Sequence, residues 1–307
     1  MCLPAIINLI MRINSLLSPY ILTADIGGSH ITVGICDLES YEIVNQSIIR
    51  AEVNSKGSIT DILTSWTNKF QEVLKRNSNL HTSGLSVAMP GPFDYENGIS
   101  YIKGLDKYEA LYGMDIKQYL AGLLKLDLPL VRFRNDAEST IAGEVLTGAG
   151  KGHQRVMGVT LGTGFGSAFS ENKITKDINL GSEPYKESIA DDYLSTRWFL
   201  KRYRELTGIS LTGGVRELSE LAAKSTVAQG VFKEFANNMG DFLSAPMEKL
   251  DPEVLIICGN IAKASVFFLP YLSQQLNPVT IKLAQLDENA PLIGAAAMFD
   301  DLIRPTF

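Results

Sequence analysis

Cysteine is scarce in this chain of 307 residues. The three cysteines, Cys2, Cys36 and Cys258, lie far apart and form no C-x-C or C-x-x-C pair. Disulfide-stabilised domains and structural zinc sites both depend on closely spaced cysteines, so we expect neither. A chain with so few cysteines is typical of the reducing cytoplasm, and we predict a cytoplasmic protein.

Positive charge is also in short supply. The 28 Lys and Arg residues against 34 Asp and Glu give a formal net charge of −6, and the basic residues form no run. Nucleic-acid binding requires a basic surface that can neutralise phosphates. We therefore expect no nucleic-acid partner.

Long apolar runs are missing as well, and no stretch is long enough to span a bilayer. The N-terminal residues MCLPAIINLIMRINSLLS are apolar but are interrupted by Asn8 and Arg12. They have no basic start and no small-residue cleavage pattern, which an export signal would carry. We predict an N-terminal extension over residues 1–18, with the true start at Met1 or Met11 left open, and no membrane partner.

Glycine-rich turns occur twice in the same setting. The stretches ILTADIGGSHITVGICD (21–37) and VMGVTLGTGFGSAFS (156–170) each predict two short strands joined by a glycine turn. Glycine can take positive φ and approach a ligand closely, so that backbone N–H groups converge on phosphate oxygens. Each turn alone could be an ordinary hairpin turn. Together they predict a duplicated unit that holds one polyphosphate from two sides.

Helices and strands alternate after each hairpin. Strand-like alternation continues over 42–51, and apolar spacing then predicts a helix over 58–74. The remaining predicted elements are strands at 84–88, 130–133 and 254–257, helices at 116–124 and 137–148, a helix-rich stretch over 191–250 and a closing helix that begins near Leu292. This order predicts an α/β fold.

The length of the chain predicts two domains. We expect a small α/β domain formed by 19–134 and 291–307, and a large α/β domain formed by 135–290. The hinge is expected near Asn135, with a ligand cleft between the domains.

Asp25 ends the first predicted strand directly before the first glycine turn. A carboxylate at that position would hold Mg²⁺, directly or through water, while the turn N–H groups and the Ser29 hydroxyl contact phosphates. The residues predicted to bind ATP phosphates are Gly27, Gly28, Ser29, Gly162, Thr163 and Gly164.

Asn135 and Asp136 follow a predicted buried strand and precede a helix. The carboxyl end of a strand is a frequent position for active-site residues in α/β proteins. A carboxylate at residue 136 could accept a hydroxyl proton as a general base, or it could serve only as a helix cap. Both interpretations stay open at this point, because a capping Asp is also a rigidly held Asp.

Gly259 and Asn260 follow the strand VLIIC and predict a turn that a nucleotide ring or ribose could approach. The histidines His30, His81 and His153 are isolated and are interpreted as surface or local structural residues. The acidic pair at 191–192 could hold a metal, but two acids that open a helix more often stabilise its N-terminus.

In combination, these motifs resemble the ROK family, a group of bacterial sugar kinases and related repressors in the actin-like, hexokinase-like ATPase superfamily. The resemblance covers the chain from about Tyr20 to its end. It is carried, in order, by DIGGSHITVG, VAMPGPFD, NDAESTIAGE, LGTGFGSAF, CGNIA and LIGAAA.

The resemblance implies a duplicated two-domain fold of the actin-like, hexokinase-like (ribonuclease H-like) type and ATP-dependent phosphorylation of a sugar hydroxyl, with ATP and Mg²⁺ as cofactors. It implies that Asp136 is the catalytic base, that Asn135 contacts the sugar and that Asp25 lies near Mg²⁺. Residues Pro90 and Gly91 correspond to the sugar-side loop. The motif at Gly259 and Asn260 corresponds to the adenosine side, and homodimers are common in the family.

Departures from the family pattern concern the sugar side. The family carries a Gly-Glu-Ile/Leu-Gly-His stretch followed by zinc-binding cysteines, whereas this chain has INLGS, with Asn179 and Ser182 at the Glu and His positions. No zinc is therefore expected. Asp191 takes the place of a later sugar-binding Glu, and Glu183 could supply the lost carboxylate or simply face solvent.

The sugar itself and the hydroxyl that is phosphorylated stay open. Alternatives to a sugar kinase are a non-catalytic sugar or nucleotide sensor that kept the fold, and a kinase acting on a non-sugar hydroxyl. The family's repressors carry an N-terminal helix-turn-helix domain, and the 19 residues before the first predicted strand are too few for one, so a DNA-binding repressor is not expected.

Overall fold

The computed structural model describes residues 18–303, so the predicted N-terminal extension lies outside the described residues except for Ser18. The chain divides into two compact units: unit 1 runs to Gly143 and resumes at Glu288, and unit 2 is Glu144–Asp287. Each unit has its own sheet and helices, which confirms the α/β class. The predicted domain boundaries, after residues 134 and 290, stay a prediction.

Unit 1 is built on a six-stranded sheet with the order β3-β2-β1-β5-β8, to which β4 is added beside β2. The strands β1 and β2 form the predicted glycine hairpin, and β5 and β8 run parallel to β1. The carboxyl ends of β1, β5 and β8 therefore meet at one edge of the sheet. The strands are β1 (Tyr20–Ile26), β2 (His30–Asp37), β3 (Glu42–Ile43), β4 (Ile49–Glu52), β5 (Thr82–Met89) and β8 (Val131–Asn135).

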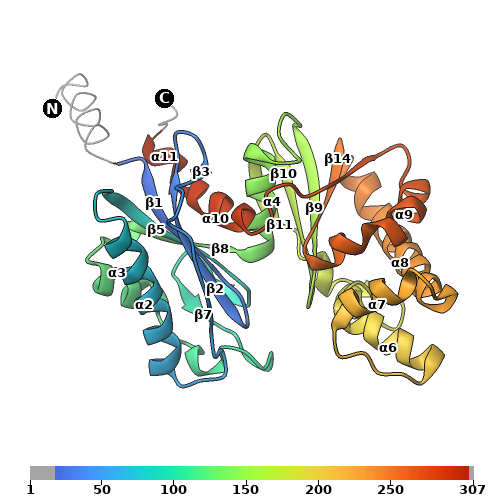
Figure 1. Cartoon of the computed structure of the whole chain (residues 1–307). Helices are drawn as coiled ribbons and strands as arrows, with labels where there is room; N and C mark the ends of the chain where they lie inside the picture. The colour runs from blue at the N-terminus through green and yellow to red at the C-terminus, as the bar shows by residue number, and fades with distance from the viewer. Residues whose placement is uncertain (1–17, 304–307) are drawn as a thin grey trace. The chain divides into compact units, whose positions relative to one another are not determined.

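Helices cover both faces of this sheet. Figure 1 shows α2 (Ile59–Arg76) and α3 (Ile116–Leu124) on one face and α10 (Asn289–Ala296) on the other. Successive side chains of β1 point to opposite faces of the sheet and so contact different helices. Leu22 packs in the same core as Trp66 of α2, while the Thr23 hydroxyl donates to Leu292 O of α10 at 2.8 Å.

Two sequence predictions for unit 1 need correction. The stretch 42–51 is not one strand: β3 ends at Ile43, a turn with Gln46 at φ 65° follows, and β4 starts at Ile49. The closing helix, predicted to begin near Leu292, begins at Asn289 and is not continuous: it ends at Ala296 before the short helices η5 (Ala297–Phe299) and α11 (Asp300–Ile303). Pro291 is tolerated there because it lies in the first turn.

Helix α4 (Asp136–Thr147) packs very closely on α10. A Cβ on Gly143 would lie 2.1 Å from Ala290 O, and one on Gly294 would lie 1.8 Å from Ser139 O. Any side chain at either glycine would force the two helices apart. The glycine of the LIGAAA motif thus has a packing role.

Unit 2 repeats the strand order of unit 1. Its sheet has the order β11-β10-β9-β14-β15, in which β9 and β10 form the second glycine hairpin and β14 runs parallel to β9, as β5 does to β1. The strands are β9 (Arg155–Leu161), β10 (Phe165–Glu171), β11 (Ile174–Asp177), β14 (Val254–Cys258) and β15 (Thr280–Leu283). The duplication predicted from the turns is present in the topology.

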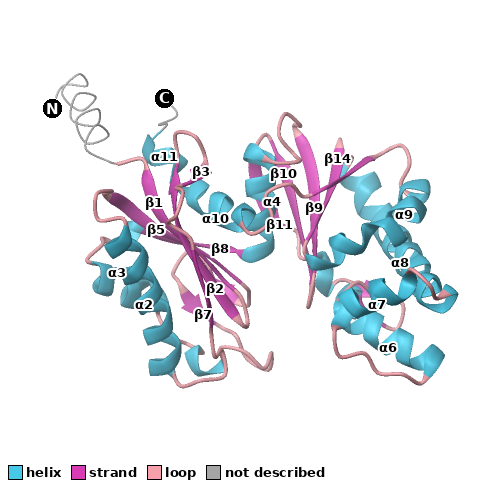
Figure 2. Cartoon of the chain, in the orientation of Figure 1, coloured by secondary structure: helices cyan, strands magenta, loops and turns pink. Residues whose placement is uncertain are grey.

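Unit 2 also contains the predicted helix-rich stretch, which Figure 2 shows in cyan. Its buried face is rich in aromatic residues; Phe199, Phe232 and Phe235 are fully buried in one core cluster. The helices are α5 (Ala190–Tyr193), α6 (Thr196–Thr207), α7 (Gly214–Ala222), α8 (Thr226–Leu250) and α9 (Leu269–Gln275).

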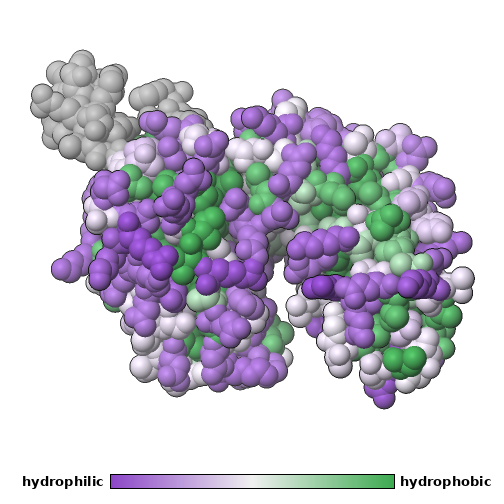
Figure 3. All heavy atoms as spheres, in the orientation of Figure 1, coloured by the Kyte–Doolittle hydropathy of each residue, from purple (hydrophilic) through white to green (hydrophobic). Residues whose placement is uncertain are grey.

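Short elements complete both units. Unit 1 contains β6 (Phe93–Asp94), β7 (Ile99–Ser100), η1 (Glu109–Leu111) and η2 (Leu128–Leu130), and unit 2 contains η3 (Leu180–Ser182), β12 (Pro184–Tyr185), β13 (Ser188–Ile189) and η4 (Asn260–Phe267). Figure 3 shows hydrophilic and hydrophobic residues interspersed on the visible surface of each unit. Across residues 18–303, no helix combines the length and the apolar character needed to cross a bilayer.

Candidate active site

Two carboxylates, Asp25 and Asp136, define the carboxyl edge of the unit 1 sheet. Asp25 is the sixth residue of β1, and Asp136 is the first residue after β8. Both positions agree with the sequence prediction. Within the described residues, no hydrogen-bond donor reaches the Asp25 carboxylate, and Asp136 accepts only from Ala137 N, through Oδ1 at 2.8 Å. Three of the four carboxylate oxygens are thus open to a ligand.

Burial changes the acidity of both groups. Loss of water on burial, together with the nearby Asp136 charge, raises the pKa of Asp25 to about 7, and the positive charge of Arg50 opposes the shift. The pKa of Asp136 is also raised by burial, while the hydrogen bond from Ala137 and the charge of Lys107 lower it. Raised carboxyl pKa values at one sheet edge are typical of a site that takes up a proton or a cation.

The first glycine turn has its carbonyl groups fixed by the protein. Gly27 O accepts from the Tyr108 hydroxyl at 2.5 Å, Gly28 O from the Ser55 hydroxyl at 2.5 Å, and Ser29 O from Val53 N at 2.8 Å. In the described part of the chain, the N–H groups of Gly28 and Ser29 have no acceptor. A turn whose carbonyls point into the protein and whose N–H groups are free is suited to bind an anion.

The second glycine turn, in unit 2, shows the same arrangement. Gly162 O accepts from Thr196 N at 2.9 Å and from the Thr196 hydroxyl at 2.8 Å, and Gly162 N donates to Gly164 O at 3.0 Å. The N–H groups of Thr163 and Gly164 have no acceptor among residues 18–303. Both predicted phosphate turns therefore offer free N–H groups.

The backbone conformation of these turns differs from the expectation. None of Gly27, Gly28, Gly162 and Gly164 has a positive φ. Glycine is needed here for access, because the backbone N–H groups are not shielded by side chains, rather than for an unusual φ. Positive φ is instead found at Gly259, at 89°, where a Cβ would lie 2.4 Å from Leu161 O. Gly259 lets the turn before Asn260 pack directly on the end of β9.

Asn135 caps helix α4, which answers one question that the sequence left open. Its Oδ1 accepts from Ala137 N at 2.9 Å and from Glu138 N at 3.1 Å, while its Nδ2 donates to the Tyr95 hydroxyl at 3.2 Å. Since Asn135 provides the cap, the Asp136 carboxylate is not needed for that purpose. One Asn135 amide hydrogen remains for a ligand.

The loop at Pro90 and Gly91 lies beside Asn135 through the same tyrosine. The Tyr95 hydroxyl donates to Met89 O at 3.1 Å and lies 3.3 Å from the position of a Cβ on Gly91. Residues Pro90, Gly91, Asn135 and Asp136 therefore belong to one neighbourhood in unit 1.

Asp191 and Glu183, predicted on the sugar side, are found in unit 2. The Asp191 carboxylate accepts from Phe165 N through one oxygen and pairs with Arg197 through the other, so both oxygens already have partners. The bond to Phe165 N holds the residue that follows the second glycine turn. Exposed Glu183 lines a cavity of about 680 Å³ with Tyr185, Asp241 and Phe242. Asn179 and Ser182 contact each other, Ser182 Oγ donating to Asn179 Oδ1 at 3.1 Å.

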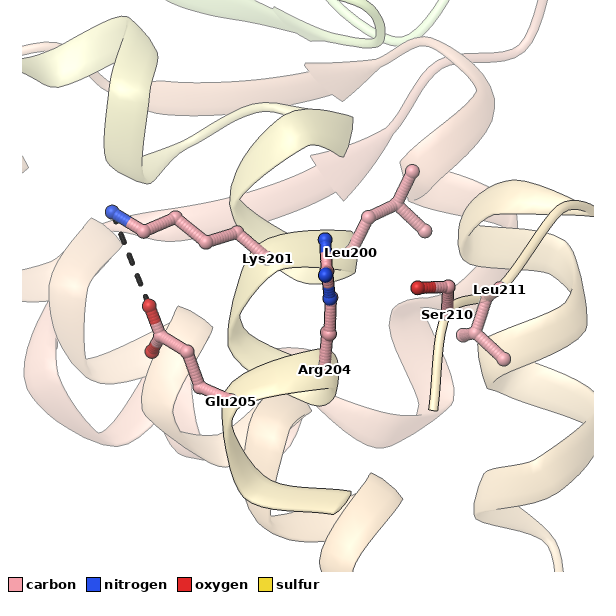
Figure 4. Close-up of a pocket in the computed structure, with 6 residues that line it drawn as sticks. All are labelled: Leu200, Lys201, Arg204, Glu205, Ser210 and Leu211. Atoms are coloured by element: carbon pink, nitrogen blue, oxygen red, sulfur yellow. Dashed lines mark ion pairs between the residues drawn. The ribbon is translucent and has the colours of Figure 1, made fainter. Parts of the chain in front are cut away.

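Three further hollows in the described part of the chain are lined by none of the predicted site residues. Figure 4 shows one of about 510 Å³ lined by α6 and the segment after it, in which Lys201 lies 4.0 Å from Glu205 and Arg204 projects between them and Ser210. We assign no function to this hollow.

Three residues that contact the first glycine turn or stabilise the fold were not predicted from the sequence. Lys107 lies against the first glycine turn, with its Cδ 3.4 Å from the position of a Cβ on Gly28. Tyr108 holds that turn through its hydroxyl and packs its ring edge-on against Trp66 at 5.4 Å. Glu144 is fully buried and accepts three backbone hydrogen bonds. Lys107 and Tyr108 lie in a loop with no repeating pattern, and two of the three partners of Glu144 are remote in sequence, so no local sequence signal identifies these residues.

The residues present fit a magnesium ion rather than a closed metal centre. Among residues 18–303, no group of three or more His, Cys, Asp and Glu side chains could hold a metal ion. Mg²⁺ usually keeps several waters and binds through one or two carboxylates plus substrate phosphates. Asp25, with open carboxylate oxygens beside an anion-binding turn, matches that requirement. The expected absence of zinc stays a prediction.

Replacing Asp25 by Asn should make the protein more stable at high pH. The folded-state pKa of Asp25 is about 7 against 3.8 for an ordinary Asp, so folding binds a proton between these values and wild-type stability falls as the pH rises through them. Asp25→Asn removes this loss. We expect little difference at pH 4 and a gain of about 1–2 kcal/mol at pH 8, discounted for partial exposure.

Urea unfolding of both proteins at the two pH values measures this effect. Asp115→Asn is the matched control, because Asp115 caps α3 in the same unit without lying at the site. Equal pH dependence of wild type and Asp25→Asn would contradict the assignment of a raised pKa to Asp25.

The protein thus belongs to the class of duplicated α/β proteins in which each sheet carries a glycine hairpin, and in this chain one sheet edge also carries two carboxylates, Asp25 and Asp136. The ROK family model matches residues 21–177, just over half of the chain. The chain belongs to the ROK family.

Curated relatives of similar length are named as sugar kinases. One is the N-acetyl-D-glucosamine kinase of Haemophilus influenzae, which is 23% identical over 317 residues, covering 90% of this chain and 97% of that protein. Another is the glucokinase of Thermotoga maritima, which is 21% identical over 321 residues, covering 92% of this chain and 98% of that protein.

Solved structures establish the fold. The ROK hexokinase from Thermus thermophilus has a TM-score of 0.76 at 18% identity, covering 90% of this chain and 96% of that chain. A ROK glucokinase from Streptomyces griseus, in complex with glucose and AMPPNP, has a TM-score of 0.74 at 20% identity, covering 91% and 98%. A ROK transcriptional regulator has a TM-score of 0.77 at 14% identity but only 78% of it is covered, against 92% of this chain. The chain therefore has the hexokinase-like fold that kinases and regulators of the family share.

Proposed function

We propose that this protein transfers the terminal phosphoryl group of ATP to a sugar hydroxyl, with Mg²⁺, and that Asp136 is the general base. The observation that carries the proposal is the state of Asp136. Its carboxylate is half-buried and has a free Oδ2, and the capping of α4 is done by Asn135 instead. A carboxylate held this way, and not required by the helix, is available for proton transfer.

In the proposed mechanism, Asp136 Oδ2 accepts the proton of the attacking sugar hydroxyl and orients its oxygen. Asn135 Nδ2 and the backbone at Pro90 and Gly91 bind other hydroxyl groups of the sugar. The position of Asn135 is fixed because its Oδ1 is held by two backbone N–H groups. A pre-positioned acceptor hydroxyl lowers the entropic part of the barrier.

Phosphate binding is assigned to the two glycine turns. In unit 1 the N–H groups of Gly28 and Ser29, the Ser29 hydroxyl and the backbone at Gly27 contact phosphate oxygens, and in unit 2 the backbone of Gly162, Thr163 and Gly164 does so. Asp25 would hold Mg²⁺, which when bound neutralises phosphate charge. We assign Gly259 and Asn260 to the adenosine. That both turns serve one nucleotide stays a prediction.

Asp191 and Glu183 differ in how far their carboxylates are available to a sugar. The two Asp191 oxygens are occupied by Phe165 N and Arg197, so a sugar would have to displace one of them. The Glu183 carboxylate is exposed on unit 2 and has no hydrogen-bond partner among residues 18–303, so Glu183 keeps its proposed role as a sugar ligand.

A non-catalytic sensor is the second candidate, because the fold is shared with a ROK transcriptional regulator and because Asn179 and Ser182 take the place of the Glu and His expected by resemblance. ADP release from Mg-ATP, measured against a panel of hexoses, N-acetylhexosamines and non-sugar polyols, separates the candidates. Release that depends on one sugar supports the kinase. Tight sugar or ATP binding without release from any acceptor supports the sensor and contradicts the kinase.

A further inference from the structure

Lys107 is the basic side chain that lies at the first glycine turn, and neither the sequence motifs nor the fold assigns it a role. Its Cδ is 3.4 Å from the position of a Cβ on Gly28, the residue whose N–H is free. The side chain is half-buried and has no hydrogen bond or ion pair to any residue of the described chain. Lys107 thus adds a positive charge beside a turn whose N–H groups are free to bind an anion.

The neighbours of Lys107 are held firmly, so its position at the turn is fixed by the fold. Tyr108 N donates to Ser55 O at 2.6 Å, and the Tyr108 hydroxyl donates to Gly27 O at 2.5 Å. Tyr108 itself is fully buried. On the other side, Asp106 pairs with Lys56. The Lys107 stem therefore leaves the backbone directly beside the turn.

The same ammonium group is close enough to Asp136 for its charge to act on that carboxylate. The Lys107 side chain thus lies beside the phosphate-binding turn and within electrostatic range of the base that activates the acceptor hydroxyl, the two groups between which a phosphoryl group must pass. Positive charge aimed at the equatorial oxygens of a phosphoryl group lowers the barrier to its transfer. A lysine acts there as a point charge with three donors.

We propose that Lys107 contacts the phosphoryl group during its transfer and stabilises the charge on its oxygens. This proposal rests on the phosphotransferase function proposed above. The bond between the γ-phosphorus and the bridging oxygen breaks, the bond to the sugar oxygen forms, ADP leaves with the bridging electrons, and the hydroxyl proton goes to Asp136. Lys107 keeps its own proton throughout.

Turnover of Lys107→Met should be about 10²-fold below that of the wild type, with little change in KM for the sugar, because the contact is strongest in the transition state. Lys107→Arg keeps a positive charge and should recover part of the loss. Lys103→Met is the matched control: Lys103 is exposed in the same loop, with its ammonium 5.4 Å from the Tyr112 ring, and its loss should leave turnover unchanged within twofold.

A pH profile separates this role from an indirect one through Asp136. Lys107 lowers the pKa of Asp136, so Lys107→Met should shift the acid limb of kcat/KM to higher pH. The other charged groups of this edge, Asp25 on β1 and Arg50 on β4, are unchanged in the variant. If turnover of Lys107→Met at high pH remained far below that of the wild type, the phosphoryl contact would be supported. Full recovery at high pH would overturn it.

Nucleotide binding provides a readout that does not need an acceptor. Calorimetry with ADP and with the imido analogue of ATP should show that Lys107→Met weakens the analogue several-fold and leaves ADP unchanged. If Lys107→Met changed the affinities for ADP and for the analogue equally, or changed neither, the proposed role of Lys107 would be overturned. Sugar-dependent turnover of the wild type would in that case still support the proposed function. A wild type that binds the analogue but phosphorylates no sugar would contradict the function, and the Lys107 result would still stand on binding. A wild type that binds neither nucleotide would overturn both.

Discussion

Replacing Asp136 by Asn should lower sugar-dependent ADP release by about 10²–10⁴-fold while ATP still binds. The amide oxygen at residue 136 can still accept from Ala137 N, and Asn135 still caps α4, so the local structure should be kept. What is lost is the only group at this edge that we assign to the hydroxyl proton. Steady-state kinetics and calorimetry with the imido analogue measure the two quantities.

Asp115→Asn is the control for this experiment. Asp115 Oδ1 accepts from Gln118 N at 2.7 Å at the start of α3, so the variant removes an equivalent carboxylate from a helix start in the same unit. It should keep full turnover. If Asp136→Asn retained more than about a tenth of wild-type turnover, Asp136 would not be the general base. Loss of nucleotide binding in the variant would instead point to a structural role.

The second large effect concerns stability. Glu144 is fully buried in unit 2. Its Oε1 accepts from Gln285 N at 2.9 Å and Leu286 N at 2.8 Å, and its Oε2 accepts from Ala149 N at 2.8 Å. These bonds fix the chain just before α10 to the last turns of α4. Glu144→Ala should lower the free energy of unfolding by about 3 kcal/mol, because the buried N–H of Ala149 and the part-buried N–H groups of Gln285 and Leu286 lose their acceptor.

Glu144→Gln should cost less, since its amide oxygen can still serve Gln285 and Leu286 while the NH₂ group faces Ala149 N–H. Glu248→Ala on the exposed surface of α8 is the control and should stay within about 0.5 kcal/mol of the wild type. Urea unfolding measures all three variants. A Glu144→Ala protein as stable as Glu248→Ala would show that the three hydrogen bonds of the Glu144 carboxylate contribute nothing measurable to stability.

Local patterns were sufficient for the elements that carry the proposed chemistry. The glycine hairpins, the strand predicted at 130–133 and the helix predicted at 137–148 each depend on a few neighbouring residues. The structure confirms these elements, with the strand at Val131–Asn135 and the helix at Asp136–Thr147. The alternation of apolar and polar residues over 42–51 predicted one continuous strand, which is wrong. The structure has a turn at Gln46 that divides this stretch into two strands.

Contacts between distant segments could not be predicted in the same way. The Tyr108 hydroxyl reaches Gly27 across 81 positions of sequence, and Glu144 reaches Leu286 across 142. The structural role of Asp191 follows from its contacts with Phe165 and Arg197, and no rule of sequence spacing connects these residues to it. These residues position the turns and the helices around the site, so the precision of the site depends on tertiary contacts that a single sequence does not reveal.

The most direct measurement is phosphorus NMR of the wild-type protein incubated with Mg-ATP and the sugars that release ADP. The account predicts the loss of the ATP γ-phosphorus signal together with a new phosphomonoester signal of the sugar, and neither change with Asp136→Asn. Appearance of inorganic phosphate alone, or an ATP spectrum that stays unchanged with every sugar, would contradict phosphoryl transfer to a sugar hydroxyl.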